Sequence, residues 1–152
     1  MDDTDRKILA AMQASPDSSV ADIADKVGLS NTPCWRRIKR MESVGIIRGR
    51  ALILDQRALG LTLNIFAHIK LKQHDEDTLE ALEAAVQKLP EVVECFSMGG
   101  ESDYLLRIVE KDIESYERFL KKVLLHLPGV ASINSSFALG VTKMTTSLPL
   151  SA

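Results

Sequence analysis

The sequence contains few cysteines, few aromatic residues and no long run of apolar side chains. Two of its 152 residues are cysteine and 5% are aromatic. Cys34 and Cys95 lie far apart and match neither a disulfide framework nor a metal-binding spacing, so we expect no metal site and a reducing, cytoplasmic setting. The longest segment without a charged side chain, 123–142, is interrupted by Pro128, which excludes a membrane span. We also expect no signal peptide, because the first residues are acidic.

The sequence also lacks a large excess of charge of either sign. It carries 19 Lys and Arg against 21 Asp and Glu, a net charge of −2, whereas nucleic-acid binders usually show a basic excess. The charge is unevenly spread, because six basic residues and one acidic residue fall within 30–50. Such clustering is typical either of a surface that binds a polyanion or of a solvated basic helix. The rest of the chain is acidic, so the sequence has two parts of different character.

Apolar spacing in the first part predicts three consecutive helices, over about 4–13, 19–27 and 31–44. Polar residues that favour helix N-termini precede each of them. The expected caps are Asp3 or Thr4, Ser18 or Ser19, and Ser30. Gly28 and Gly45 are placed to end the second and third helices. Two short helices joined by a glycine-containing turn, the second basic on its exposed side, are typical of a helix-turn-helix; a plain three-helix bundle is the alternative.

In a helix-turn-helix the second helix enters the major groove, and its N-terminal residues meet base edges. The candidate base contacts are Ser30, Asn31, Thr32, Arg36 and Arg40. The candidate phosphate contacts are Arg37, Lys39, Arg48 and Arg50. We expect Cys34 and Trp35 to pack in the core rather than to contact DNA.

The second part of the sequence repeats a strand-helix-strand pattern. Apolar and polar residues alternate over 61–71, which predicts a strand with one buried face. A helix from about 77 to 89, a strand over 92–98, a turn over 99–102 and a strand over 103–109 follow. A helix from 112 to 127 and a strand over 131–141 complete the pattern. This order predicts a βαββαβ ferredoxin-like fold with helices on one side of an antiparallel sheet, and the open side is expected to bind a second copy.

No residues form a recognisable catalytic arrangement. His68, His74 and His126 are scattered and have no partner at a catalytic spacing, and no phosphate-binding loop of specific length occurs. We therefore expect no catalytic residue and no cofactor. A small enzyme on a ferredoxin-like fold is the less favoured alternative, because that fold supports many chemistries.

The segment Leu29–Glu42, LSNTPCWRRIKRME, with the following Gly-Ile-Ile, resembles the recognition helix of the Lrp/AsnC (feast/famine) transcriptional regulators. The opening Asp5–Leu9 and the 99–104 turn are also similar to that family's, and the resemblance covers nearly the whole chain. It implies an α+β fold: an N-terminal winged-type helix-turn-helix over 1–47, a connector over 48–60, and a ferredoxin-like (RAM-type) effector-binding and oligomerisation domain over 61–152. It also implies homodimers that assemble into octamers, double-stranded DNA as a partner, and a response to a small amino acid.

By that resemblance the effector site is lined by Gly99, Gly100, Glu101, Ser102, Asp103 and Tyr104. Paired glycines expose N–H groups that can bind a carboxylate, and Asp103 can pair with an α-ammonium. Equally, the glycines can form a plain hairpin turn that Asp103 caps.

Two further features bear on the effector. The family's Gly-Asp-Tyr-Asp-like run is here Gly-Glu-Ser-Asp, which leaves the effector's identity open. The tail 145–150 is similar to tails in a branch that includes cysteine-responsive members, so an aliphatic or sulfur-containing amino acid is the expected class. A protein that organises DNA without sensing a metabolite is the alternative function.

Overall fold

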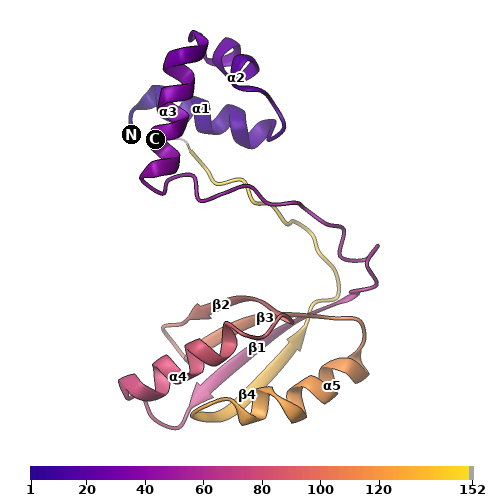
Figure 1. Ribbon diagram of the computed structural model, residues 1–152. Helices are drawn as coiled ribbons and strands as arrows, with labels where there is room; N and C mark the ends of the chain where they lie inside the picture. Colours follow the sequence, from indigo (N-terminus) through magenta and orange to yellow (C-terminus); the bar gives the residue numbers. More distant parts are fainter. Residues whose placement is uncertain (151–152) are drawn as a thin grey trace. The chain divides into compact units, whose positions relative to one another are not determined.

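The computed structural model describes residues 1–150 and comprises two compact units (Figure 1). One unit consists of Met1–Ile53 together with the tail from Lys143, and the other is Leu54–Thr142. The family resemblance implies a C-terminal domain that includes the tail, whereas in the structure the tail groups with the N-terminal helices. The sequence pattern could not reveal this, because the tail has no periodicity and is held through its backbone.

Three helices form the N-terminal unit: α1 (Asp3–Ala14), α2 (Val20–Val27) and α3 (Asn31–Ser43). The N-cap of α1 is Asp2 rather than Asp3 or Thr4. Asp2 is the N-cap because its side chain accepts a hydrogen bond from the backbone N–H of Asp5. The carboxylate of Asp5 in turn accepts one from the N–H of Asp2.

The other two helix starts follow the sequence prediction. Ser19 caps α2 in a reciprocal arrangement with Asp22, and Gly28 ends the helix in the left-handed conformation at φ +71°. Ser30 stands at the N-cap of α3, but its hydroxyl makes no capping hydrogen bond. That hydroxyl is therefore not committed to the helix.

The three helices bury one small apolar core, as their spacing predicts. Cys34 lies in it, as expected, and burial raises the pKa of its thiol. The other fully or nearly fully buried side chains of this core are Ile8, Ile23, Ala24, Ile38 and Met41. Residues 44–62, which follow α3, form turns and extended chain without a strand.

The C-terminal tail attaches to α1 through its backbone. The amide of Gln13 donates to the carbonyl of Leu148 at 3.0 Å and accepts the N–H of the same residue at 2.7 Å. Arg6 donates to the carbonyl of Leu150 at 3.4 Å. A side-chain amide thus pairs with the tail as a neighbouring strand would.

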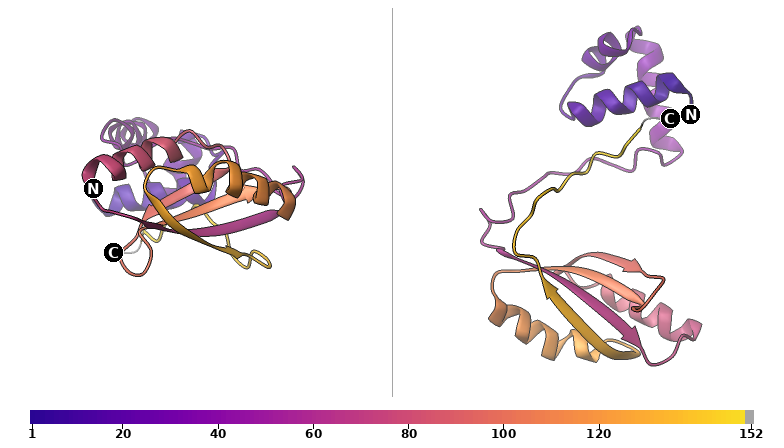
Figure 2. Two further views of the ribbon diagram at one scale, coloured as in Figure 1. Left: turned by 90° about the horizontal axis from the view of Figure 1, so that it is seen from below. Right: turned by 180° about the vertical axis from the view of Figure 1, so that it is seen from behind.

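The C-terminal unit is a four-stranded antiparallel sheet in the order β2-β3-β1-β4. Its strands are β1 (Leu63–Leu71), β2 (Val92–Ser97), β3 (Tyr104–Glu110) and β4 (Val130–Phe137). Two helices, α4 (Glu76–Val86) and α5 (Ile113–Lys122), lie on the same side of the sheet (Figure 2). The predicted βαββαβ order is therefore confirmed.

The alternation predicted for β1 places its odd-numbered residues in the core. Ile65, Ala67 and Ile69 are fully buried against side chains of both helices. The opposite face of the sheet carries the alternate positions, where Phe96 of β2 pairs with Leu105 of β3 and Phe66 of β1 lies one strand further along. This helix-free face is partly apolar.

Three predicted boundaries are wrong. Helix α4 ends at Val86 rather than residue 89, because the N–H groups of Lys88 and Leu89 bond to carbonyls three residues back instead of four. Helix α5 ends at Lys122, and a 3₁₀ turn, η1 (Leu124–His126), replaces the predicted last turns up to Pro128. Apolar spacing of three continues through a 3₁₀ turn, so the pattern could not separate the two. Strand β4 ends at Phe137 rather than residue 141, because its ladder with β1 ends at the pair of Ile65 and Phe137.

Candidate nucleic-acid interface and effector site

The N-terminal half of α3 presents polar side chains to solvent. Asn31, Thr32 and Arg36 are exposed, and so is Ser30 at the cap. Opposite them, Cys34 and Ile38 anchor the helix in the core. The structure thus gathers the four predicted base-reading residues other than Arg40 on one exposed stretch of helix.

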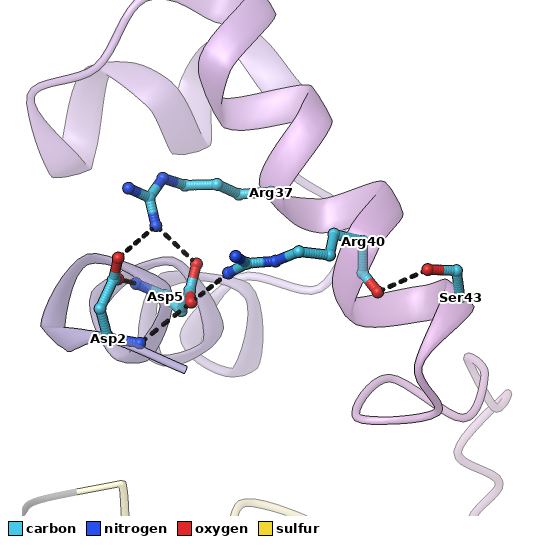
Figure 3. Close-up of polar contacts among 5 residues, drawn as sticks. All are labelled: Asp2, Asp5, Arg37, Arg40 and Ser43. Atoms are coloured by element: carbon cyan, nitrogen blue, oxygen red, sulfur yellow. Dashed lines mark hydrogen bonds and ion pairs between the residues drawn. The ribbon is translucent and has the colours of Figure 1, made fainter.

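Arg37 and Arg40 are engaged by carboxylates at the start of α1 (Figure 3). Arg37 donates from Nη1 to Asp5 at 2.9 Å and to Asp2 at 2.7 Å, and Arg40 donates to the other Asp5 oxygen. Asp5 itself is fully buried. This cluster has no signal in the sequence, because helical patterning places an acid of the first turn in solvent.

The ion pairs shift the titration of both acids. Burial alone would raise the pKa of Asp5, but the hydrogen bonds from the Asp2 backbone and Arg37 outweigh it and hold the pKa below its ordinary value. The hydrogen bond from Arg37 lowers the pKa of Asp2 to about 2. Both acids are therefore ionised at neutral pH, and they fix the two guanidinium groups against α1.

The remaining basic residues differ in their freedom. Lys39 pairs with Glu42 at 2.8 Å. Within Asn31–Ser43, all of which the structure describes, Arg36 is the one basic residue without an ion pair. Arg48 and Arg50 are exposed in the extended segment after α3. Within α3, Arg36 is thus the basic side chain that is free of ion pairs with the protein itself and available to a ligand.

Trp35 contradicts the sequence prediction that it packs in the core. Its side chain is 49% exposed. It lines a shallow hollow of about 300 Å³ together with Val20, Ala21, Asn31 and Thr32. The sequence does indicate a partly exposed position, since Trp35 lies one residue, or about 100° around the helix axis, from the buried Cys34. That angle places it at the border of the polar face.

The predicted effector residues surround the turn between β2 and β3. Gly99, Gly100 and Glu101 are exposed there, and Gly100 has a φ of +127° that favours glycine. The hydroxyl of Ser102 lies 3.4 Å from Nδ1 of His68 on β1.

Asp103 ties this turn to the end of β1. Its carboxylate accepts the Leu71 backbone N–H at 2.8 Å and contacts Nε2 of His74 at 2.8 Å. The Leu71 and His74 hydrogen bonds lower the pKa of Asp103. The carboxylate therefore stabilises the turn through contacts within the chain.

Tyr104 begins β3 and is buried, so it supports the turn from beneath. Its hydroxyl donates to Glu83 of α4 at 2.6 Å. Burial, then this carboxylate, raises the pKa of Tyr104 to about 12.

No group of three or more His, Cys, Asp or Glu side chains in residues 1–150 is placed to hold a metal ion. None of the helices in the same residues is long and apolar enough to cross a membrane.

Comparison with known proteins gives matches for both units. Residues 64–148 match the Lrp/AsnC ligand binding domain, and residues 1–48 match a winged helix-turn-helix DNA-binding family. The chain is 39% identical over 150 residues to the DNA-binding transcriptional activator DecR of Escherichia coli, covering 99% of each protein.

Two solved structures resemble the chain over 99% of its length and 97% of theirs. An AsnC family transcriptional regulator from Agrobacterium tumefaciens is 43% identical, with a TM-score of 0.93. The transcriptional regulator NMB0573 from Neisseria meningitidis, solved in complex with L-Met, is 38% identical, with a TM-score of 0.92.

Proposed function

Since this chain belongs to the Lrp/AsnC family of DNA-binding transcriptional regulators, we propose that α3 reads a specific DNA sequence and that the C-terminal unit responds to a small amino acid. The observation that carries the proposal is the exposed, basic N-terminal half of α3, held on a closed core by its opposite face. A helix of this kind fits the major groove.

The proposed DNA surface contains all nine residues predicted from the sequence, in three roles. Ser30, Asn31, Thr32 and Arg36 contact base edges, where an arginine can pair bidentately with guanine. Lys39, Arg48 and Arg50 contact phosphates, which position the helix without reading sequence. Arg37 and Arg40 add positive charge from fixed positions, because Asp5 and Asp2 hold their guanidinium groups.

The proposed effector site is the 99–104 turn. The N–H groups beside Gly99 and Gly100 bind the carboxylate of an amino acid, and Asp103 accepts its α-ammonium. The ammonium then takes the place of His74, because that side chain occupies one Asp103 oxygen in the structure. An aliphatic or sulfur-containing amino acid is the proposed class, and the L-Met complex of the Neisseria regulator supports it.

The proposed assembly is a homodimer that associates further into an octamer in the cytoplasm. The helix-free face of the sheet supports this, since it carries Phe66, Phe96 and Leu105, whereas both helices of the C-terminal unit lie on the other side. Two recognition helices in a dimer would read a roughly palindromic site with half-sites about 34 Å, or a multiple of it, apart.

Two substitutions test the assignment of α3. Arg36→Ala should reduce the ratio of affinities between a DNA sequence selected by the wild-type protein from a random library and random DNA. Lys39→Ala should weaken binding to all sequences alike and lower the salt slope by about one unit. If both variants bind like the wild type at several salt concentrations, the proposed DNA surface is wrong.

Calorimetry against the twenty amino acids tests the effector. One amino acid should bind, and Asp103→Ala should abolish its binding while leaving DNA affinity without effector unchanged. If no amino acid binds the protein or raises its melting temperature, the alternative function, in which the protein organises DNA without an effector, is favoured.

A further inference from the structure

Trp35 occupies an unusual place on α3. The single tryptophan of the chain lies among the polar residues of the proposed DNA surface, with about half of its side chain in solvent. Within Asn31–Ser43 it is the one large apolar side chain that is exposed. An apolar side chain on a helix surface lacks the favourable free energy of burial unless another surface covers it.

The helical core offers Trp35 no place. Ile8, Cys34, Ile38 and Met41 close the space between the helices and are themselves fully or almost fully buried. Within residues 1–150 the indole N–H of Trp35 makes no hydrogen bond. The position of this side chain is thus not explained by the fold of its own unit.

The surface beside Trp35 is hollow and partly apolar. Val20 and Ala21 of α2 form one wall, and Asn31 and Thr32 of α3 form the other, around a volume of about 300 Å³. The hollow therefore lies between the two helices of the helix-turn-helix, next to the first residues of the recognition helix. An apolar group that enters it contacts the indole and the two small aliphatic side chains together.

The charges around the hollow select its occupant. Arg36 follows Trp35 directly and has no internal partner in α3, and Lys39 lies one turn further along the same exposed side. Cations that neighbour Trp35 along α3 favour a polyanion over an apolar protein surface. On double-stranded DNA, the apolar group that projects into the major groove is the C5-methyl of thymine.

We propose that Trp35 is a specificity-determining residue that contacts the C5-methyl group of one thymine in each half-site, with the methyl seated in the hollow against Val20 and Ala21. The inference rests on the proposed sequence-specific DNA binding and deepens it, because it adds an apolar contact to the polar ones. It assigns thymine, rather than either base of an A·T pair, to that position.

A methyl-deletion scan tests this contact. The full chain first selects its preferred duplex from a random library, and each thymine of that duplex is then replaced in turn by deoxyuridine, which lacks only the methyl group. Wild-type affinity should fall about 4-fold at one position per half-site, the value of one buried methyl group. In Trp35→Ala the same replacement should cost less than 2-fold, and Trp35→Phe should give an intermediate loss.

The controls separate a lost contact from a damaged fold. Val44→Ala removes an apolar, exposed side chain from the residue that follows α3 and should leave the wild-type scan unchanged. Far-UV circular dichroism identifies variants that fail to fold, in which case Trp35→Phe carries the test. Fluorescence of the single tryptophan should change when wild-type protein binds the duplex, because DNA covers the indole.

The outcomes are distinguishable from those of the proposed function. If a sequence is selected but the scans of wild type and Trp35→Ala agree at every thymine, Trp35 does not read a methyl group. If no sequence is enriched at all, sequence-specific binding itself is refuted, and the inference is refuted with it.

Discussion

Replacing Asp5 by Asn should destabilise the N-terminal unit by about 2 kcal/mol. The substitution keeps the volume and one acceptor oxygen but removes the charge that Arg37 and Arg40 contact. A hydrogen bond to a charged group contributes about 1.5–3 kcal/mol when buried. The two arginine side chains are 31% and 55% exposed, so water can replace much of what they lose, and the lower end of the range applies to their sum.

Urea unfolding followed by tryptophan fluorescence measures this loss. Trp35 is the only tryptophan and belongs to the N-terminal unit, so its emission reports that unit separately from the other one. With an m value of about 1 kcal/mol/M for so small a unit, the midpoint should fall by about 2 M. Asp3→Asn is the matched control, since Asp3 is also an acid in the first turn of α1 but is exposed.

The same variant should bind random DNA more tightly. Without the buried carboxylate, Arg37 and Arg40 are free to reach phosphates, and each added phosphate contact steepens the salt dependence by about 0.9 units. Equal urea midpoints for Asp5→Asn and Asp3→Asn, together with an unchanged salt slope, would refute the reasoning that Asp5 holds these arginines.

Three further predictions concern other parts of the chain. Because the pKa of Asp2 is lowered from 3.8 to about 2, its contribution to stability is complete above about pH 4 and is lost as the pH falls toward 2; the urea midpoint should decline over this window, and the decline should be smaller in Asp2→Asn. Gly129→Ala should destabilise the C-terminal unit by about 3 kcal/mol in thermal unfolding, because φ is +71° and the new Cβ lies 2.2 Å from the methyl carbon of Thr78. The control Gly60→Ala has a similar φ of +75° but open space around the new Cβ, and it should cost about 1 kcal/mol. Equal losses for the two variants would contradict the steric argument. Gln13→Ala should accelerate amide exchange at Leu148, whose N–H it accepts, and unchanged exchange measured by NMR would show that the tail needs no such anchor.

Most of the fold could be predicted because its elements have strong local signals. The alternation in β1 and the apolar spacing of the helices follow from which faces are buried, and the family, the α+β fold and the regulator function predicted from the sequence are confirmed. The errors occur where a boundary depends on a partner strand, as at Phe137, or where two helix types share one spacing, as at Leu124–His126.

The candidate sites were less predictable, because they depend on contacts between distant residues. No periodicity indicates that Asp5 is buried beneath two arginines 32 and 35 residues away. Likewise, the residue type of Trp35 suggested a core position, whereas the core was already filled. The type of a residue shows which contacts it is able to make. The packing of the helices determines which of those contacts form.

The return of the tail to α1 makes the C-terminal unit, in topological terms, an insertion within a loop of the N-terminal one. The entry and exit of that insertion are neighbouring strands, since Ile65 pairs with Phe137 and the N–H of Ala138 donates to Asn64. Folding of the sheet thus closes the loop and removes much of the chain entropy that the tail would otherwise lose on reaching α1. It follows that any molecule that stabilises the sheet also favours attachment of the tail, which gives the two units a thermodynamic link along the chain itself.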